Sequence, residues 1–308
     1  MSSTRPTYHP AIYGLALFST IWAFLLLISG ALVTSNGASL AILDWPRSHG
    51  AWILSHLSGG DVYQYPHRVI AGVLGLLTLL LTALLWAKEE RKWVRWLGVL
   101  ALSCVVAQAV LGGEVVLQFL HYWLPVWHAI FAQIMFGAIL TVAVVTRKWW
   151  ISERTELEDS GSPSIQALAW LNALVIFAQS FLGAGFRHND VPFWPHTVGA
   201  LAVLATVVWT AVALRKRFAG ARELTKMRMW LHSVFGVQFL LGFAAYWAHM
   251  KNADTIGPMP SAVILTVTHA AIGALLFAVA LVTVLLTYRL VPGKSAATVS
   301  SNPRMAVE

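Results

Sequence analysis

The strongest constraint on this chain is a series of eight apolar runs, each about twenty residues long, which is the length that a helix needs to cross a bilayer. The runs lie near residues 11–33, 66–87, 96–119, 127–146, 165–186, 195–214, 229–250 and 262–288. The polar start of the first run shows no small-residue cleavage site, which favours a retained helix over a signal peptide. We therefore expect an all-α membrane protein with eight transmembrane helices.

Composition supports this fold class and excludes an ordinary soluble domain. Hydrophobic residues make up 58% of the chain and charged residues 11%, whereas a soluble domain carries about 25% charged residues. Tryptophans gather at the ends of the apolar runs, as an interfacial aromatic belt requires. They are Trp86, Trp93, Trp96, Trp123, Trp127, Trp149, Trp150, Trp194 and Trp247.

Basic residues predict the orientation in the membrane. If the N-terminus is inside, only four of the 21 Lys and Arg residues fall on the outer side: Arg47, Arg68, Arg187 and Lys251. The positive-inside rule then places both termini in the cytoplasm of a bacterial-type cell membrane. The net charge of +8 follows from this asymmetry and from attraction to anionic lipid, so it indicates no nucleic-acid partner.

The sequence of the first four runs is repeated in the last four. The matching positions are Gly30-Ala31 with Gly183-Ala184, His67 with His196, Gln108 to Gly112 with Gln238 to Gly242, and His128 with His269. This pattern predicts two repeated four-helix bundles that run in the same direction, over residues 1–151 and 165–290. Residues 152–164 are expected to form a flexible cytoplasmic linker, and residues 291–308 a disordered tail.

The repeat also pairs four histidines, His67, His128, His196 and His269, which lie at or near the outer ends of apolar runs. An intramembrane histidine is a functional hypothesis by default, because burying it in hydrocarbon costs free energy. Two neutral imidazoles that face each other in a helical bundle suit haem iron, which predicts one haem site in each half. Small residues would make room for the flat group: Ala71-Gly72, Gly112-Gly113, Gly199-Ala200, Gly242 and Gly273.

Two other interpretations of the histidines stay open at this point. Histidines at the interface can simply bond water or backbone, which is the better interpretation for a lone histidine but a poorer one for two repeated pairs. A zinc or copper site would need three or four ligands, and only two histidines converge in each half. The single cysteine, Cys104, excludes a disulfide within the monomer.

Two charged positions near the paired histidines are further candidates. Glu114 is a carboxylate within an apolar run, where a charge costs roughly 2.5–3.5 kcal/mol. It is either a structural group, paired with Arg68 or reached by solvent near the interface, or a group that handles protons, and the two interpretations are equally supported. Arg187 and His188, in an outer loop, could meet the propionates of a haem.

Several motifs resemble the haem A synthases. The segment from Gly30 to Gly37, followed by Asp44-Trp45-Pro46, is similar to the first outer loop of that family. His67-Arg68 with Ala71-Gly72 resembles its HR motif. The other three histidines of the two pairs fall where the family places its remaining ligands.

The resemblance implies an oxidoreductase that converts the C8 methyl group of haem O into a formyl group by successive hydroxylations. His67 and His128 would then bind the substrate haem O. His196 and His269, with Arg187 nearby, would hold a b-type haem that relays electrons. A haem O synthase and terminal oxidase assembly factors are the partners that the family suggests.

The chain departs from the family pattern in two places. Ile42 and Ser48 stand near positions where many bacterial members have a cysteine pair. Gln64 stands three residues before His67, where the family has a glutamate, and an amide cannot shuttle a proton as a carboxylate can. The catalytic candidates are therefore Glu114, Gln64 and Arg68, with Asp61 as an alternative carboxylate.

Three other functions compete with this one. A non-catalytic haem-binding or haem-delivery protein is compatible with Gln64. A bis-histidine cytochrome that only transfers electrons would usually place its haems at different depths, whereas here all four histidines lie toward one face. A transporter would show helices broken at mid-membrane, and matching Pro/Gly interruptions are lacking.

Overall fold

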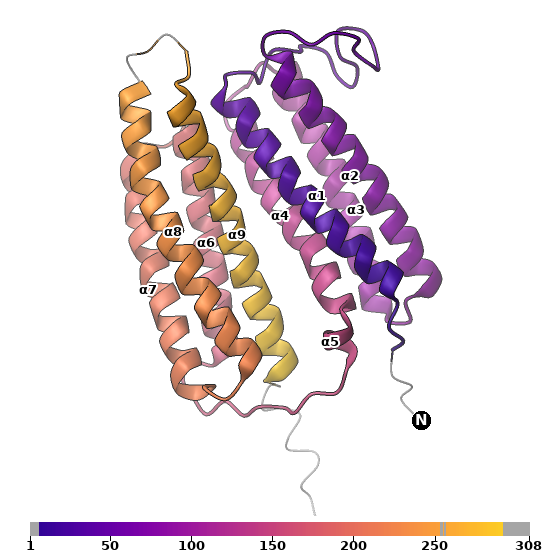
Figure 1. Cartoon of the computed structure of the whole chain (residues 1–308), viewed down its shortest axis with the longest axis vertical. Helices are drawn as coiled ribbons and strands as arrows, with labels where there is room; N and C mark the ends of the chain where they lie inside the picture. Colours follow the sequence, from indigo (N-terminus) through magenta and orange to yellow (C-terminus); the bar gives the residue numbers. More distant parts are fainter. Residues whose placement is uncertain (1–5, 253–254, 256, 292–308) are drawn as a thin grey trace, which may run out of the picture.

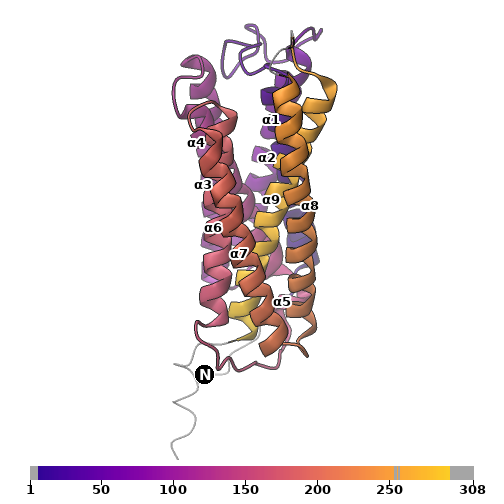
Figure 2. The same ribbon diagram turned by 90° about the vertical axis from the view of Figure 1, so that its left-hand side faces the viewer.

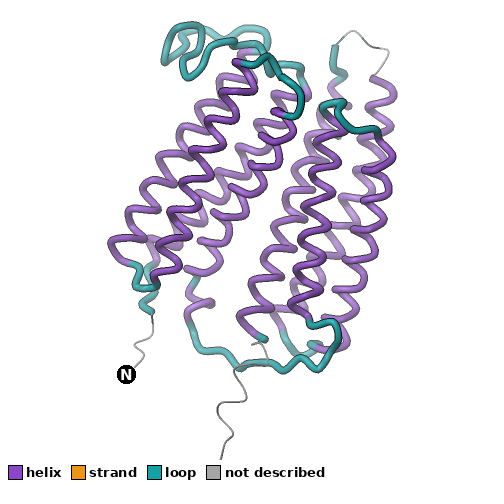
Figure 3. The backbone as a smooth tube through the Cα atoms, turned by 180° about the vertical axis from the view of Figure 1, so that it is seen from behind, coloured by secondary structure: helices purple, strands orange, loops and turns teal. Residues whose placement is uncertain are grey.

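The computed structural model describes residues 6–252, 255 and 257–291. Eight of its helices are long and apolar enough to cross a membrane, which confirms the expected fold class. In chain order the helices are α1 (Pro10–Ser35), α2 (Asp61–Lys88), α3 (Lys92–Leu117), α4 (Leu124–Thr146), the short α5 (Lys148–Ile151), α6 (Ile165–Arg187), α7 (Phe193–Arg217), α8 (Arg222–Asn252) and α9 (Pro260–Leu290). Figure 3 shows this helical content and the loops that join the helices.

The long helices pack in two groups (Figure 1). In the first group α1, α2, α3 and α4 pack in sequence, and α4 also packs against α1. In the second group α6, α7, α8 and α9 pack in sequence, and α9 returns to α6. The groups meet where α1 and α4 contact α9 and where α4 contacts α6, so the boundary between them is itself a packed helix interface (Figure 2).

The ends of two helices differ from the sequence prediction. Helix α2 begins at Asp61 and contains Pro66, whereas the apolar run predicted a start at Pro66. An acidic side chain in the first turn favours this earlier start, because it complements the positive end of the helix dipole. Helix α8 begins at Arg222, seven residues before its predicted start at 229, because its first turns are charged and carry an ion pair between Glu223 and Lys226.

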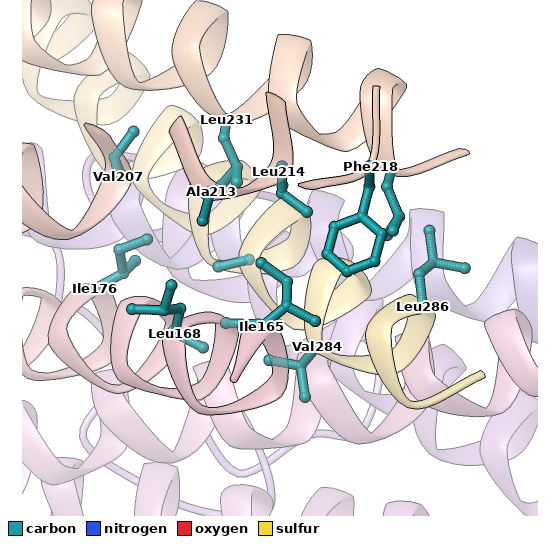
Figure 4. Packing of buried hydrophobic residues seen from close by; sticks show 14 of the residues in the cluster. Ile165, Leu168, Ile176, Val207, Ala213, Leu214, Phe218, Leu231, Val284 and Leu286 are labelled. Carbon is teal, nitrogen blue, oxygen red and sulfur yellow. The ribbon is translucent and has the colours of Figure 1, made fainter. Parts of the chain in front are cut away.

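The apolar core of the second group lies near the linker between the two groups. Ile165, Leu168, Leu214 and Phe218 belong to this buried cluster and pack with Val284 of α9 (Figure 4). Side chains from α6, α7 and α9 thus share one core at this end. We call this the linker end and the opposite end, which carries the loop 36–60, the loop end.

Residues of the linker are hydrogen-bonded to helices of the second group, whereas the composition of the linker predicted a flexible segment. The Leu157 amide donates to the Leu290 carbonyl at 2.8 Å. Arg217 donates to the Pro163 carbonyl at 2.8 Å and contacts the Asp159 carboxylate at 3.4 Å. These contacts attach the linker to the second group. Residues 291–308 were expected to be disordered. Apart from residue 291, this segment lies outside the described residues.

Candidate functional site: paired histidines at the loop end

The four predicted histidines lie on helices that start from the same end of the molecule. His67 is in α2, His128 in α4, His196 in α7 and His269 in α9, each within the first ten residues of its helix. Because consecutive long helices alternate in direction, these four helices all begin at the loop end (Figure 1). The helix packing places one pair of histidines in each group.

The C-terminal pair has the spacing that a shared metal requires. The ring centroids of His196 and His269 are 6.3 Å apart, and the rings are nearly perpendicular, at 80°. An imidazole nitrogen binds a metal at about 2 Å, so two rings on opposite sides of one metal have their centroids roughly 6 Å apart. The observed centroid distance of 6.3 Å is close to that spacing. In the N-terminal pair, His67 and His128 are close enough to interact electrostatically.

Each of the four imidazoles lies against a glycine of a neighbouring helix. A Cβ atom placed on that glycine would lie closer to the histidine Cε1 atom than an ordinary van der Waals contact. The distances are 3.1 Å for Gly30 to His67, 2.9 Å for Gly112 to His128, 2.9 Å for Gly183 to His196 and 3.3 Å for Gly242 to His269. A side chain at these positions would displace the ring, so the glycines keep the space in which the imidazoles lie.

The other small residues that the sequence suggested have different neighbours. A Cβ atom on Gly113 would meet the ring of Trp45 at 2.7 Å, so this glycine accommodates the first outer loop. Gly199 lies against Gln179, and Gly273 lies against Gln238. A Cβ atom on Gly72 would have no neighbour within 4 Å. Of the predicted set, Gly112 and Gly242 are the glycines that touch a paired histidine.

The sequence interpretation missed three glutamines that contact the paired histidines. They are Gln108, which contacts His128, Gln179, which contacts His196, and Gln238, which contacts His269. Gln108 and Gln238 were noticed only as repeat markers. The signal that could have found the set is its spacing, since each glutamine stands four residues before one of the glycines described above.

The donor set suits haem better than a metal ion held by protein side chains alone. Within residues 6–252, 255 and 257–291, no group of three or more His, Cys, Asp and Glu residues could hold a metal. The Nδ1 atoms of His67 and His269 are buried without a hydrogen-bond partner, which is costly unless another group satisfies them. Two imidazoles per site, held in glycine-lined space, fit the axial ligation of haem iron.

Arg68 and Gln64 both bind the first outer loop. Arg68 Nη1 donates to the carbonyls of Asp44 and Arg47 at 2.8 and 2.7 Å, and its Nη2 donates to the Ile42 carbonyl at 3.1 Å. The Gln64 side chain accepts from the Ile42 amide at 2.6 Å and donates to the Ser39 carbonyl at 2.9 Å. Both residues therefore hold the loop over the N-terminal group, and the donated bonds of Gln64 require an amide.

The carboxylates of Asp44 and Asp61 also contact groups of the first outer loop. Asp44 accepts from the backbone amides of His49 and Gly50 at 2.8 and 2.7 Å. Partial burial raises the pKa of Asp44, but these hydrogen bonds outweigh it, so the net pKa is lowered. Asp61, the alternative carboxylate, contacts His49 at 3.2 Å.

Glu114 has a different partner from the one expected. Its carboxylate accepts a hydrogen bond from the Gln118 amide at 2.5 Å, one turn further along α3. The guanidinium of Arg68 is occupied by loop carbonyls and a structural Glu114–Arg68 pair is not the arrangement observed. Glu114 lies near the loop end of α3, in the same group as His67 and His128.

Arg187 connects the two groups near the C-terminal pair. Its Nη2 atom donates to the Ala31 carbonyl at 2.8 Å and to the Ser35 hydroxyl at 2.6 Å, both in α1. Ser35 in turn contacts Thr266 of α9 at 3.1 Å. The neighbouring His188 caps α6, and burial together with the Arg187 charge lowers its pKa to about 4.

Fold and site together define a polytopic helical membrane protein with two pairs of histidines suited to haem. A family model described as cytochrome oxidase assembly protein matches residues 61–194, which contain His67, His128 and Arg187. Proteins named heme A synthase are similar to this chain. The one from Lysinibacillus sphaericus (strain C3-41) is 28% identical over 191 residues, which is 58% of this chain and 60% of that protein.

Two further relatives carry the same name. The heme A synthase of Geobacillus kaustophilus (strain HTA426) is 24% identical over 58% of this chain and 57% of its own length. That of Staphylococcus saprophyticus is 22% identical over 59% of this chain and 62% of its own length. The matches therefore span about 60% of the relatives' length. They agree with the resemblance to the haem A synthases that the sequence motifs predicted.

Proposed function

We propose that this protein is a haem A synthase, which oxidises the C8 methyl group of haem O to a formyl group by successive hydroxylations. The observation that carries the proposal is the placement of two histidine pairs at one end of the membrane fold, each imidazole against a glycine. The names of the relatives point to the same activity. The placement also disfavours a cytochrome that carries electrons across the bilayer, since such a protein needs haems at different depths.

The two pairs have different roles in this proposal. His67 and His128 bind the substrate haem O. His196 and His269 hold a resident b-type haem, which supplies electron relay when it is bound. The 6.3 Å spacing of the C-terminal rings supports a permanent ligand there. Arg187 lies within electrostatic range of His269 and stabilises negative charge on the resident group.

Proton handling falls to the N-terminal group. We propose Glu114 as the proton-handling carboxylate, because Gln64 cannot take that role and is engaged with the loop. Arg68 and Gln64 keep the loop closed over the substrate side and exclude water from it. A Glu114→Gln substitution should lower turnover without changing haem content. Unchanged turnover in a protein with normal haem content would remove Glu114 from the mechanism.

The proposal includes a cellular setting. The protein lies in a bacterial-type cell membrane with both termini in the cytoplasm and the histidines toward the outer face. A haem O synthase supplies the substrate, and terminal oxidase assembly factors receive the product. Cysteine accessibility labelling from outside the cell, with single cysteines placed at Ser55 and at Ser160, tests the orientation. Labelling of the Ser160 position from outside would reverse it.

The decisive experiment is haem extraction and chromatography. The protein is produced together with a haem O synthase in a host that makes no haem A. We expect haem A or its hydroxylated intermediate, and expect both to disappear in a His67→Ala variant. Recovery of haem B and haem O alone, from protein with a bis-histidine spectrum, would overturn the proposed activity.

That negative outcome would instead support a haem-binding or haem-delivery protein. One observation favours this second function: the residue at the position of the family's glutamate is an amide, and it is bonded to loop carbonyls. A haem carrier needs ligands and a closed loop but no proton-transferring carboxylate. The same extraction experiment therefore separates the two functions.

A further inference from the structure

Three of the four paired histidines face a glutamine at a constant position in the fold. Each glutamine lies four residues, about one helical turn, before the glycine that its histidine contacts, so glutamine and glycine share one helix face. The sets are Gln108, Gly112 and His128; Gln179, Gly183 and His196; and Gln238, Gly242 and His269. Because the same contact recurs on three different helix pairs, it indicates that the three glutamines have the same function.

The glutamines hold their histidines at the ring and, in two cases, at the backbone. Gln108 Nε2 lies 3.1 Å from His128 Nδ1 and donates to the His128 carbonyl at 2.8 Å. Gln179 makes the same two contacts with His196, also at 3.1 and 2.8 Å. Gln238 Nε2 lies 3.4 Å from a ring nitrogen of His269. An amide held at two points of one residue restricts the rotation of the imidazole.

The side-chain oxygen of each of the three glutamines accepts no hydrogen bond. The Oε1 atoms of Gln108, Gln179 and Gln238 are all buried without a partner. In all three contacts the amide nitrogen Nε2 faces the ring, so the acceptor oxygen Oε1 is not hydrogen-bonded to the ring. Gly199 and Gly273 leave the space for the amides of Gln179 and Gln238.

His67 differs from the other three histidines. The residue four positions before its glycine, Gly30, is Leu26, which cannot donate or accept a hydrogen bond. The Nδ1 atoms of His67 and His269 are both buried without a partner, but the Nε2 atom of His269 contacts Gln238. The structure thus leaves the ring of His67 without the restraint that the other three rings have.

We propose that Gln108, Gln179 and Gln238 are positioning residues for haem ligation. Each fixes the rotation of its histidine through its amide nitrogen. His67, which lacks such a partner, is the weakest and most exchangeable of the four ligands. The inference rests on the proposed function only in that the histidines ligate haem iron.

The test uses purified full-length protein with haem B as the probe, and needs no turnover. Haem transfer to an excess of apomyoglobin gives the dissociation rate, and a redox titration gives the midpoint potential. Gln179→Leu and Gln238→Leu should each speed haem loss from the C-terminal pair by about 10–100-fold, the usual effect of losing an outer partner. Their midpoint potential should rise, because a less firmly held imidazole stabilises ferric iron less.

Two further variants separate this role from general packing. Gln238→Glu removes the amide nitrogen that contacts the ring but keeps the length of the side chain, so it should speed haem loss as Gln238→Leu does. Leu26→Gln gives His67 the partner that it lacks and should slow haem loss from the N-terminal pair. Unchanged rates and potentials in both leucine variants, with haem bound normally to the unaltered protein, would overturn the inference alone. Absence of any bis-histidine haem in the unaltered protein would overturn the proposed function as well.

Discussion

The two groups of helices present the same histidine arrangement in different surroundings. In the C-terminal group both histidines contact a glutamine, and only the short segment 188–192 joins α6 to α7. In the N-terminal group His67 has no such contact, and the long loop 36–60 lies at its end, bonded to Arg68 and Gln64. In the proposed function, the C-terminal pair holds the resident haem firmly and the N-terminal pair admits the substrate haem under the loop.

The largest expected effect comes from removing a ligand of each pair in turn. His269→Ala should abolish the firmly held haem, because the remaining imidazole cannot bind iron from both sides. His67→Ala should leave that haem in place and affect only the N-terminal pair. Haem-to-protein stoichiometry and the low-spin absorption spectrum measure both effects. His232→Ala, at an exposed position near the linker end, is the control. Equal haem loss from the His269→Ala and His67→Ala variants would contradict the expected difference between the two histidine pairs.

The glycines beside the histidines offer the next test. Gly183→Ala and Gly112→Ala put a methyl group 2.9 Å from a histidine Cε1 atom and should cost about 1–3 kcal/mol by overpacking, together with disturbed haem spectra. Gly242→Ala, at 3.3 Å, should be milder. Thermal unfolding and absorption spectra give the measurement. Gly72→Ala, where the methyl group would have no neighbour within 4 Å, should be neutral. A similar loss at Gly72 would show that helix packing in general, and not the imidazole, is sensitive.

Gln64→Glu tests the loop of the N-terminal group. A carboxylate cannot donate to the Ser39 and Ile42 carbonyls, and unpaired groups of this kind cost about 1–3 kcal/mol. Hydrogen exchange should therefore speed up at the amides of residues 38–42, while amides in α8 serve as the unchanged reference. Higher product yield in this variant would indicate that a carboxylate at this position aids chemistry. Unchanged exchange in the loop would mean that Gln64 does not hold it.

The smallest expected effect concerns pH and His188. Because the folded-state pKa is about 4 and the usual value is 6.5, the unfolded chain binds more protons between these values. Stability should therefore fall as pH drops from about 6.5 toward 4, and His188→Gln should reduce that fall. Thermal unfolding in detergent across this range measures it. Identical pH profiles for the two proteins would show that the environment of His188 differs from the one observed.

Much of the molecule could be predicted from patterns that depend on neighbours along the chain. The eight helices follow from apolar runs, because a helix satisfies its backbone hydrogen bonds internally wherever lipid surrounds it. The four histidines stood out because imidazoles are rare and costly in such runs. The starts of α2 and α8 were placed too late, because Asp61 and the charged residues after Arg222 are polar yet helical.

Other features depended on contacts between distant residues. Nothing in the local sequence shows that Gln64 bonds Ser39, that Arg68 binds loop carbonyls, or that Gly113 packs on Trp45. The linker looked flexible by composition, but Arg217 and Leu290 of other helices hold it. These partners are far apart in the chain and meet only when helices pack.

The sequence by itself determined the membrane class, the eight long apolar helices of the described residues and the candidate ligands, because hydrophobicity and residue type act locally. The tertiary structure decided which glycine and which glutamine face each histidine, and which histidine has no polar partner. The physical reason is that hydrogen bonds and steric fit act over a few ångströms. Their partners are therefore selected by the way the helices pack, which no single segment of the chain specifies.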